Sequence, residues 1–346
     1  MAKRIVAIYD RGIDKNLMQG FDVLEKYGYE LTLVEKTVNE DELAYQNSML
    51  SVEVNGPDGT PINEEVFQYL DDAEIIITHF APVSRRMIEA AKNLKIIATL
   101  RTGMENINME AAKERGIKGI NAPGRAAVAV ADFTVAAMLC EIRNIARTDE
   151  DIKTGGWTKK YPNRTYSDNM CNLKVGLVGF GDIGRKIATR LKGFGTTILA
   201  YDPYCTKESI EAFGCVPVSL DELLEQADFV SLHVRLSPQT QNMFGAAEFA
   251  KMKPTAIFVN AARAGLVDEA AMIDALEQKK IGGAVLDVFR EEPLPVDHPL
   301  RKLKNVTLSA HLAGTDIGTF SGSIKIVADN LEQYFSGGEL KNVVNH

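Results

Sequence analysis

The sequence has little of what would place a protein in a membrane or outside the cell. Its 346 residues include four cysteines, none at C-x-x-C spacing, so we expect free thiols in a reducing compartment rather than disulfides or zinc ligands. No apolar run reaches the roughly 20 residues of a membrane-spanning helix. The N-terminus, MAKRIVAIYDRG, lacks the apolar core and cleavage site of a signal peptide. These absences favour a cytoplasmic protein without a metal site.

Positive charge is also scarce. Lys and Arg number 39 against 47 Asp and Glu, which gives a formal net charge of -8. This balance disfavours a nucleic-acid or anionic-membrane surface, although it leaves room for a local basic pocket that binds a small anion. The hydrophobic content of 45% is that of a globular protein, and a chain of this length suits two domains.

The segment Lys174–Tyr204 is the most informative part of the chain. It begins with an apolar run, Val175–Val178, that is typical of a buried parallel strand. The pattern GFGDIG and a helical stretch follow, and a second apolar run, Thr197–Tyr201, ends at Asp202. This order predicts a dinucleotide-binding β-α-β unit rather than an isolated tight turn.

Each residue type in this unit has a physical role. Gly179 permits the tight strand-to-helix turn, Gly181 lets the backbone approach a pyrophosphate, and Gly184 allows helix and strand to pack closely. The positive end of the helix then faces the phosphates. Asp202 can accept hydrogen bonds from the adenine-side ribose and would repel a 2′-phosphate, which favours NAD over NADP.

Apolar runs alternate with helical patterns along the chain, which predicts an α/β fold with parallel sheets. A break at Pro123-Gly124 places a domain boundary near Asn121, and the helical stretch Asp316–Phe335 is expected to return to the N-terminal domain. The predicted strands are Ile5–Tyr9, Leu31–Val34, Glu74–Thr78, Lys95–Leu100, Ile117–Ile120, Val175–Val178, Thr197–Tyr201, Phe229–His233, Ala256–Asn260, Gly283–Asp287 and Val306–Ser309.

Four connecting segments carry weaker patterns. Glu40–Leu50 is predicted to be helical, and Ser51–Ile62, with Asn-Gly and Pro-Asp-Gly, is either a small hairpin or a surface insertion. Ala126–Ala146 is predicted to be one long apolar helix, in the core or at a subunit interface. Thr154–Asn172 is predicted to be an extended loop.

Three polar residues follow predicted strands downstream of the glycine-rich unit: Arg263 in NAARAGLVD, Glu292 in LDVFREEPLP and His311 in SAHLAG. Ligands of open α/β sheets bind beyond the carboxyl ends of the strands, so these residues arrive at one edge. The set suits hydride transfer with NAD. His311 can serve as acid or base, Glu292 can orient it and favour its protonated form, and Arg263 can hold a carboxylate.

Each of these residues also has a purely structural interpretation. Arg263 could pair with Asp268 at a helix start, Glu292 could be a solvated loop acid, and His311 could be a packed histidine. Their shared position at strand ends, downstream of a nucleotide unit, is what favours a site.

At these motifs the sequence resembles the D-isomer-specific 2-hydroxyacid dehydrogenase family, in particular its phosphoglycerate dehydrogenase-like members. GFGDIGRKIA, YDPY, HVRLSPQTQNMF, NAARAGLVD, LDVFREEPLP and SAHLAG follow the family's order, and RTGMENIN and NAPGRAAVAVADF resemble its substrate loop and domain crossover. The resemblance implies two Rossmann-like domains with the active site between them, and a homodimer through the cofactor domain. Residues 121–313 would bind NAD and be inserted into a flavodoxin-like substrate domain formed by residues 1–120 and 314–346.

The resemblance also implies a role for each site residue. The catalytic set would be Arg263, Glu292 and His311, with the arginine binding the substrate's carboxylate and reacting oxygen. Asp287 would contact the nicotinamide carboxamide. The implied cofactor-binding residues are Gly179, Gly181, Asp182, Ile183, Gly184, Asp202, His233, Ala261, Arg263, Asp287 and His311. The implied substrate-binding residues are Arg101, Gly103, Met104, Arg263 and His311.

Some features depart from the family's common pattern and leave the substrate open. Ala264 follows Arg263 where glycine is more usual, Arg235 stands where proline is frequent, and the Ser51–Ile62 segment is long. Phosphoglycerate, glycerate or hydroxypyruvate, lactate-like and larger sugar acids all fit. His79 is either a pocket residue or a bystander. No appended C-terminal regulatory domain is expected.

Two related activities compete with this interpretation. Formate dehydrogenases resemble the same family but pair their histidine with glutamine, so Glu292 favours hydroxy-acid chemistry. The same fold also serves as an NAD(H)-sensing, corepressor-like binding protein, which would need a peptide-docking groove and disordered tails.

Overall fold

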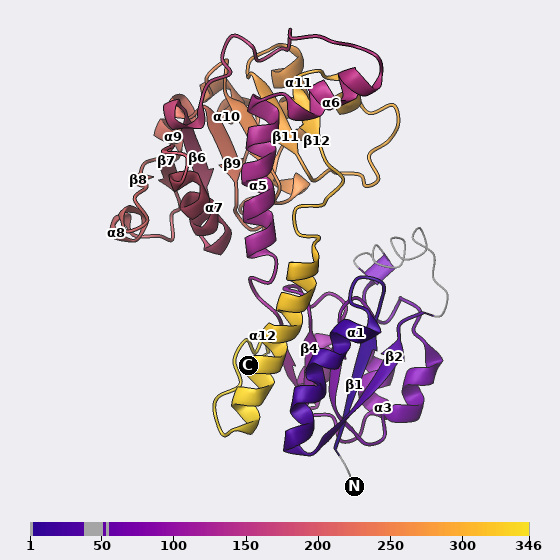
Figure 1. The fold of residues 1–346 in the computed structure, drawn as a ribbon. Helices are drawn as coiled ribbons and strands as arrows, with labels where there is room; N and C mark the ends of the chain where they lie inside the picture. Colours follow the sequence, from indigo (N-terminus) through magenta and orange to yellow (C-terminus); the bar gives the residue numbers. More distant parts are fainter. Residues whose placement is uncertain (1–2, 38–50, 53–54, 346) are drawn as a thin grey trace. The chain divides into compact units, whose positions relative to one another are not determined.

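The computed structural model describes residues 3–37, 51–52 and 55–345. The chain forms two compact units, drawn in Figure 1. The first comprises Met1–Arg125 and Asp316–His346, and the second comprises Ala126–Thr315. The second unit therefore interrupts the first in sequence. Each unit has a parallel sheet, so the predicted fold class, two α/β domains of which one is inserted into the other, is confirmed.

The first unit contains a five-stranded parallel sheet in the order β2-β1-β3-β4-β5. Successive side chains of β1 enter different cores: Ile5 and Ala7 pack on one face, and Val6 and Ile8 on the other. Both faces are covered, which is why these strands are continuously apolar rather than alternating. The strands are β1 Lys3–Tyr9, β2 Tyr29–Glu35, β3 Ala73–Thr78, β4 Ile96–Thr99 and β5 Lys118–Ile120.

Helices cover both faces of this sheet. The C-terminal helix α12, Ile317–Phe335, packs with the short helical segments near the N-terminus on one face. Its N-cap Asp316 accepts a hydrogen bond from the amide of Thr319, and its return to the N-terminal unit is as expected. The other helices are α1 Lys15–Met18, η1 Gln19–Tyr27, η2 Glu64–Tyr69, α3 Arg85–Ala90 and α4 Met109–Glu114.

The second unit contains a seven-stranded parallel sheet in the order β12-β11-β10-β9-β6-β7-β8. The chain enters at β6, in the interior, and the strand order changes direction between β6 and β9. Such a switch point is where open α/β sheets bind ligands. The strands are β6 Lys174–Val178, β7 Thr197–Tyr201, β8 Val216–Pro217, β9 Phe229–Leu232, β10 Ile257–Asn260, β11 Gly283–Leu286 and β12 Val306–Leu308.

The helices of the second unit form two layers. Those between β8 and β11 pack on one face around Phe244, Phe249 and Phe258, and α5, α7 and α8 pack on the other. The helices are α5 Ala127–Ile142, α6 Ile145–Lys153, α7 Asp182–Lys192, α8 Lys207–Glu211, α9 Leu220–Gln226, α10 Ala246–Lys251 and α11 Glu269–Glu277, with short η3 Met170–Asn172, η4 Ala264–Leu266 and η5 Pro299–Lys302.

The prediction of one helix over Ala126–Ala146 is wrong at its C-terminal end. Asn144 adopts left-handed backbone angles, with φ of 55°, and separates α5 from α6. Its side chain donates to Asn163 Oδ1 at 2.7 Å, and Asn163 in turn donates to the carbonyl of Glu141 at 2.9 Å. Asparagine tolerates this conformation, and the break satisfies the last turn of α5.

The Ser51–Ile62 segment is not a hairpin, since its described residues form no strand. The carboxylate of Asp58 instead accepts from the amide of Arg85, the first residue of α3, at 2.7 Å and from the side chain of Asn108 at 2.5 Å. The segment is thus fixed onto the first unit by a polar anchor. The predicted helix Glu40–Leu50 lies outside the described residues.

No helix in the described ranges combines the length and apolar character needed to cross a membrane. Thr154–Asn172 is mainly loop, as expected, with only η3 at its end.

The phenylalanine cluster gives a stability prediction for the second unit. Phe258 is fully buried and its ring centroid lies 5.2 Å from that of Phe249. Phe258→Ala should lower the free energy of unfolding of this unit by about 3–5 kcal/mol, measured by urea denaturation, because it removes buried area and leaves a cavity. Val296 is 89% exposed, so Val296→Ala serves as the control and should change little. Equal midpoints for the two variants would contradict this packing.

Candidate functional site

The glycine turn after β6 has the geometry that close approach requires. Gly179 has φ of +97°, and a Cβ there would lie 2.7 Å from the backbone of His233. A Cβ on Gly184 would lie 2.5 Å from the carbonyl oxygen of Gly179, so helix α7 packs directly on the turn. A Cβ on Gly181 would meet nothing within 4 Å, which leaves open space on the side where a pyrophosphate would lie.

The first residues of α7 present unpaired backbone donors to this space. Within the described chain, the amides of Gly181, Asp182 and Ile183 donate no hydrogen bond. Free N–H groups at a helix N-terminus are suited to phosphate oxygens. These features fit a dinucleotide pyrophosphate.

Asp202 ends β7 beside this turn. One carboxylate oxygen accepts from the amide of Phe180 at 2.7 Å, and the other accepts from the amide of Tyr204 at 2.8 Å. The carboxylate therefore holds the glycine turn against the end of the neighbouring strand. Each oxygen retains a second lone pair, which leaves acceptors for a ribose.

His311 and Glu292 form an ion pair at the carboxyl edge of the same sheet. His311 Nδ1 lies 2.8 Å from Glu292 Oε2, and Glu292 Oε1 accepts from the amide of Phe289 at 2.9 Å. The His311 side chain is 49% exposed, so it is not the packed histidine of the structural interpretation. With Nδ1 facing the carboxylate, Nε2 is the nitrogen left for a substrate oxygen.

The contact between His311 and Glu292 favours the charged form of each side chain. The hydrogen bond to Glu292 raises the pKa of His311 above its ordinary value, against the lowering effect of burial. For Glu292, burial is the largest single influence and raises the pKa. The hydrogen bonds from His311 and from the amide of Phe289, together with the charges of His311 and Arg263, lower the pKa by more in sum, so the net direction is downward. Glu292 is therefore no ordinary solvated loop acid, because it stabilises the imidazolium.

Arg263 lies in the loop that follows β10. Asn260 fixes this loop: its Oδ1 accepts from the amide of Ala262 at 3.0 Å, and its Nδ2 donates to the carbonyl of Arg263 at 3.0 Å. The charge of Arg263 acts on the pKa values of both Glu292 and His311, which places the three side chains in one electrostatic site. Asp268 caps α11 through the amide of Ala271 at 3.2 Å and forms no ion pair with Arg263.

Asp287, directly after β11, supports the loop that carries His311. Its carboxylate is 1% exposed and accepts from Ser309 Oγ at 2.6 Å and from the amides of Leu312 and Ala313, each at 2.9 Å. This positioning role was not anticipated from the sequence, and neither was that of Asn260. The nicotinamide contact that the resemblance implies for Asp287 stays a prediction.

His233, after β9, is not suited to proton transfer. Its Nε2 lies 2.8 Å from Ser231 Oγ, and burial lowers its pKa to about 3. The ring is therefore neutral at any working pH, in line with the expectation that it ends a strand near the cofactor turn.

The first unit carries the loop expected to bind substrate. Arg101 stacks on the ring of Phe80 at 4.2 Å, and its guanidinium lies 3.9 Å from Glu105. The amides of Gly103 and Met104 donate no hydrogen bond to the described residues. Two adjacent free amides can hold a carboxylate, as the resemblance implies.

His79 is buried in the first unit, and both ring nitrogens have polar partners. It is 1% exposed, its Nδ1 lies 3.1 Å from both carboxylate oxygens of Asp10, and its Nε2 lies 3.2 Å from Arg125. Since a guanidinium can only donate, Nε2 accepts and Nδ1 carries the proton. Burial lowers the pKa of His79 against the raising effect of Asp10, which agrees with this neutral tautomer.

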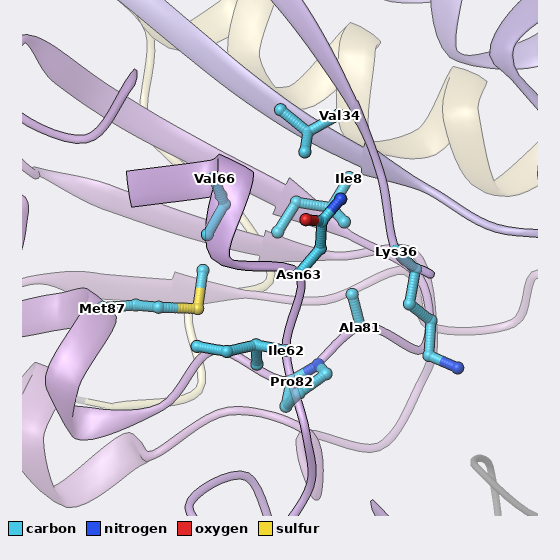
Figure 2. Close-up of a pocket in the computed structure, with 9 residues that line it drawn as sticks. All are labelled: Ile8, Val34, Lys36, Ile62, Asn63, Val66, Ala81, Pro82 and Met87. Atoms are coloured by element: carbon cyan, nitrogen blue, oxygen red, sulfur yellow. The ribbon is translucent and has the colours of Figure 1, made fainter. Parts of the chain in front are cut away.

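A small cavity in the first unit does not suit a substrate. Figure 2 shows its mainly apolar walls, with Lys36 and Asn63 as the polar members. Its volume of about 10 Å³ admits one water molecule at most. Among the described residues, no group of three or more His, Cys, Asp or Glu side chains is arranged to hold a metal ion.

Comparison with known proteins agrees with this geometry. Residues 135–313 match the family model described as D-isomer specific 2-hydroxyacid dehydrogenase, NAD binding domain. The chain is 39% identical to a D-3-phosphoglycerate dehydrogenase of Methanocaldococcus jannaschii, over 82% of this chain and 53% of that protein. It is 36% identical to a glyoxylate reductase of Korarchaeum cryptofilum, over 82% of this chain and 86% of that protein.

A solved structure shows the same fold. The NAD-complexed D-isomer specific 2-hydroxyacid dehydrogenase of Lactobacillus delbrueckii ssp. bulgaricus aligns with a TM-score of 0.77 at 23% identity, over 99% of this chain and 100% of that one. The site and fold define an α/β dinucleotide-binding protein. The chain belongs to the D-isomer specific 2-hydroxyacid dehydrogenase family. It spans about half the length of the M. jannaschii relative.

The His311–Glu292 pair gives a pH prediction. For the role of acid in keto-acid reduction that the resemblance implies for His311, the raised pKa predicts that activity persists as pH rises past the ordinary histidine pKa and falls only above the raised pKa of His311. Glu292→Gln removes the carboxylate and should move this alkaline limit to lower pH. The measurement is kcat/KM for reduction against pH. An unmoved limit in the variant would show that Glu292 does not set the titration.

Proposed function

We propose that this chain is an NAD-dependent oxidoreductase that interconverts a D-2-hydroxy acid and its 2-keto acid. The observation that carries the proposal is the His311–Glu292 pair, with Arg263 acting on both, at the same sheet edge as the glycine turn. A dinucleotide turn alone would fit many oxidoreductases. The added acid/base and fixed guanidinium are what a hydroxy acid requires.

The chemistry divides between the cofactor and the chain. The bound nicotinamide supplies hydride transfer. In reduction, Arg263 holds the carboxylate and polarises the keto oxygen, and His311 Nε2 donates the proton that completes the hydroxyl group. In oxidation the same nitrogen accepts this proton. Glu292 stabilises the imidazolium in both directions.

We infer a preference for NAD over NADP from Asp202. Its carboxylate lies at the end of β7 and would repel a 2′-phosphate on the adenine-side ribose. The residues Ala261, His233 and Asp287 end the strands between this acid and His311, which supports the cofactor-binding roles proposed for them.

The substrate proposed is a small anionic 2-keto or 2-hydroxy acid. The similar proteins carry the names D-3-phosphoglycerate dehydrogenase and glyoxylate reductase. The first unit supplies the carboxylate-binding loop Arg101, Gly103 and Met104, of which the two latter amides are available. We therefore assign substrate binding to the first unit and NAD binding to the second.

A substrate panel tests the proposed function. Purified protein is mixed with NADH or NADPH and with glyoxylate, hydroxypyruvate, pyruvate, phosphohydroxypyruvate or longer sugar keto acids, and nicotinamide absorbance is followed. Oxidation of NADH by at least one of these acids, faster than of NADPH, is the expected result. If none of these acids causes NADH to be oxidised while the protein still binds NADH, the result would contradict the enzymatic proposal and favour an NAD(H)-sensing protein.

His311→Gln tests the proton-transfer role. The variant should lose about 10²–10⁴-fold in kcat, the usual contribution of a positioned acid or base. NADH affinity, measured by fluorescence titration, should stay close to that of the wild type. Wild-type turnover in this variant would refute the assignment of His311.

We also propose a homodimer through the second unit. Ile145 and Ile152 on α6 are 57% and 48% exposed, and Trp157 just beyond is 80% exposed. Large apolar side chains gathered along one segment are typical of an interface.

Trp157→Ser should weaken this dimer, because it removes the largest aromatic side chain of the patch. Light scattering after size exclusion measures the mass of the particle in solution. Tyr204→Ser is the matched control, since Tyr204 is 96% exposed but stands apart in sequence from the patch. A wild-type particle that is already monomeric would contradict the proposal, as would a Trp157→Ser dimer of unchanged stability on dilution.

A further inference from the structure

We propose that Arg235 is a further anion-binding residue of the site, and that its guanidinium binds the pyrophosphate of the dinucleotide. The inference rests on the proposed function, because it deepens the cofactor site of the same enzyme. Four features carry it: the place of Arg235 in the sheet, the contacts of its two neighbours, its fixed backbone and its available charge.

The sheet places Arg235 between two parts of the site, the glycine turn and the Arg263 loop. It follows β9, which pairs with β6 on one side and with β10 on the other. The carboxyl end of β6 leads into the glycine turn, and that of β10 leads into the Arg263 loop. In Figure 1, β6 and β9 are seen beside one another in the second unit.

The residues on either side of Arg235 touch these two parts directly. Val234 Cγ1 lies 3.0 Å from the position that a Cβ on Gly179 would take. On the other side, Leu236 Cδ2 lies 2.9 Å from the position that a Cβ on Gly265 would take, two residues after Arg263. Arg235 therefore stands between the glycine turn and the Arg263 loop.

The backbone around Arg235 is fixed by hydrogen bonds. The hydroxyl of Thr240 donates to the carbonyl of Arg235 at 2.7 Å. The oxygen of this hydroxyl in turn accepts from the amide of Ser237 at 2.8 Å. The amide of Asn242 donates to the carbonyl of Gly265 at 2.8 Å, which ties this loop to the Arg263 loop. Only the side chain is left to order when a ligand binds, so the entropic cost is small.

The charge of Arg235 is available, unlike that of the basic residues nearer the turn. Its side chain is exposed and forms no hydrogen bond or ion pair with any residue that the structure describes. Arg185 donates to the carbonyl of Phe180 at 3.1 Å, and Lys186 pairs with Asp182 at 3.1 Å. At the turn, Lys186 is therefore ion-paired and the Arg185 guanidinium is held by a backbone carbonyl, whereas the Arg235 guanidinium keeps all its donors for a ligand; a guanidinium matches the geometry of phosphate oxygens.

The position also separates Arg235 from the reacting centre. Arg263 is the arginine whose charge acts on both His311 and Glu292. Arg235 follows β9, one strand closer to the glycine turn. The pyrophosphate is the anion that lies on that side, which is why the assignment is to the cofactor rather than to the substrate carboxylate.

Direct binding tests this inference without turnover. Affinities for NADH and for ADP-ribose, which shares the pyrophosphate but lacks nicotinamide, are measured by titration at low and moderate salt. Arg235→Gln should weaken both about 10- to 100-fold, as expected for loss of a charged hydrogen bond, and should reduce the salt dependence. Arg235→Lys should recover part of the affinity. Arg164→Gln is the control, since Arg164 is an exposed arginine in the segment that Tyr166 fastens to Gly282 at the start of β11.

Two results would overturn the proposal. Unchanged affinities for both ligands with a raised KM for the keto acid, at saturating NADH, would assign Arg235 to the substrate. Unchanged affinities with unchanged kinetics would leave it without a role at the site. If no keto acid is reduced but NADH and ADP-ribose bind more weakly to Arg235→Gln, this inference stands while the enzymatic proposal fails.

Discussion

All seven strands of the second unit run in one direction, and the site depends on this constraint. Parallel strands deliver every carboxyl end to the same edge, so segments far apart in sequence arrive side by side. The glycine turn follows β6, Arg263 follows β10 and His311 follows β12. Because the central strands β6, β9, β10 and β11 are buried on both faces, this part of the edge is rigid, and loops only a few residues long can carry the chemistry.

Polar side chains at the strand ends fix the geometry of the loops that follow. Asn260 braces the Arg263 loop, Asp287 braces the His311 loop, and Asp202 braces the glycine turn. Each satisfies backbone amides or carbonyls that would otherwise lose hydrogen bonds on leaving the sheet. The groups that would touch ligand are thereby held by residues that need not touch it, and the desolvation cost of burying Asp287 is met by three donors.

The fold class, the strand ends and the gathering of Arg263, Glu292 and His311 could be predicted from the sequence, because apolar runs, glycine spacing and strand direction are local signals. The bracing by Asn260 and the buried Asp10–His79–Arg125 contact could not, since partners that lie far apart in sequence leave no local pattern. The helix break at Asn144 was missed for a similar reason: an apolar pattern continues through it, and a hydrogen bond to Asn163 selects the turn. The identity of the substrate carries no such local signal.

The central claim is that Glu292 holds His311 as a protonated acid with Nε2 directed to substrate. Nitrogen-15 NMR of labelled protein tests it most directly, with the His311 signal identified by its loss in a His311 variant. The account predicts a midpoint above the ordinary histidine value of about 6.5 and, in the neutral form, a proton on Nδ1. A midpoint at or below that value, or a neutral form protonated on Nε2, would contradict the account.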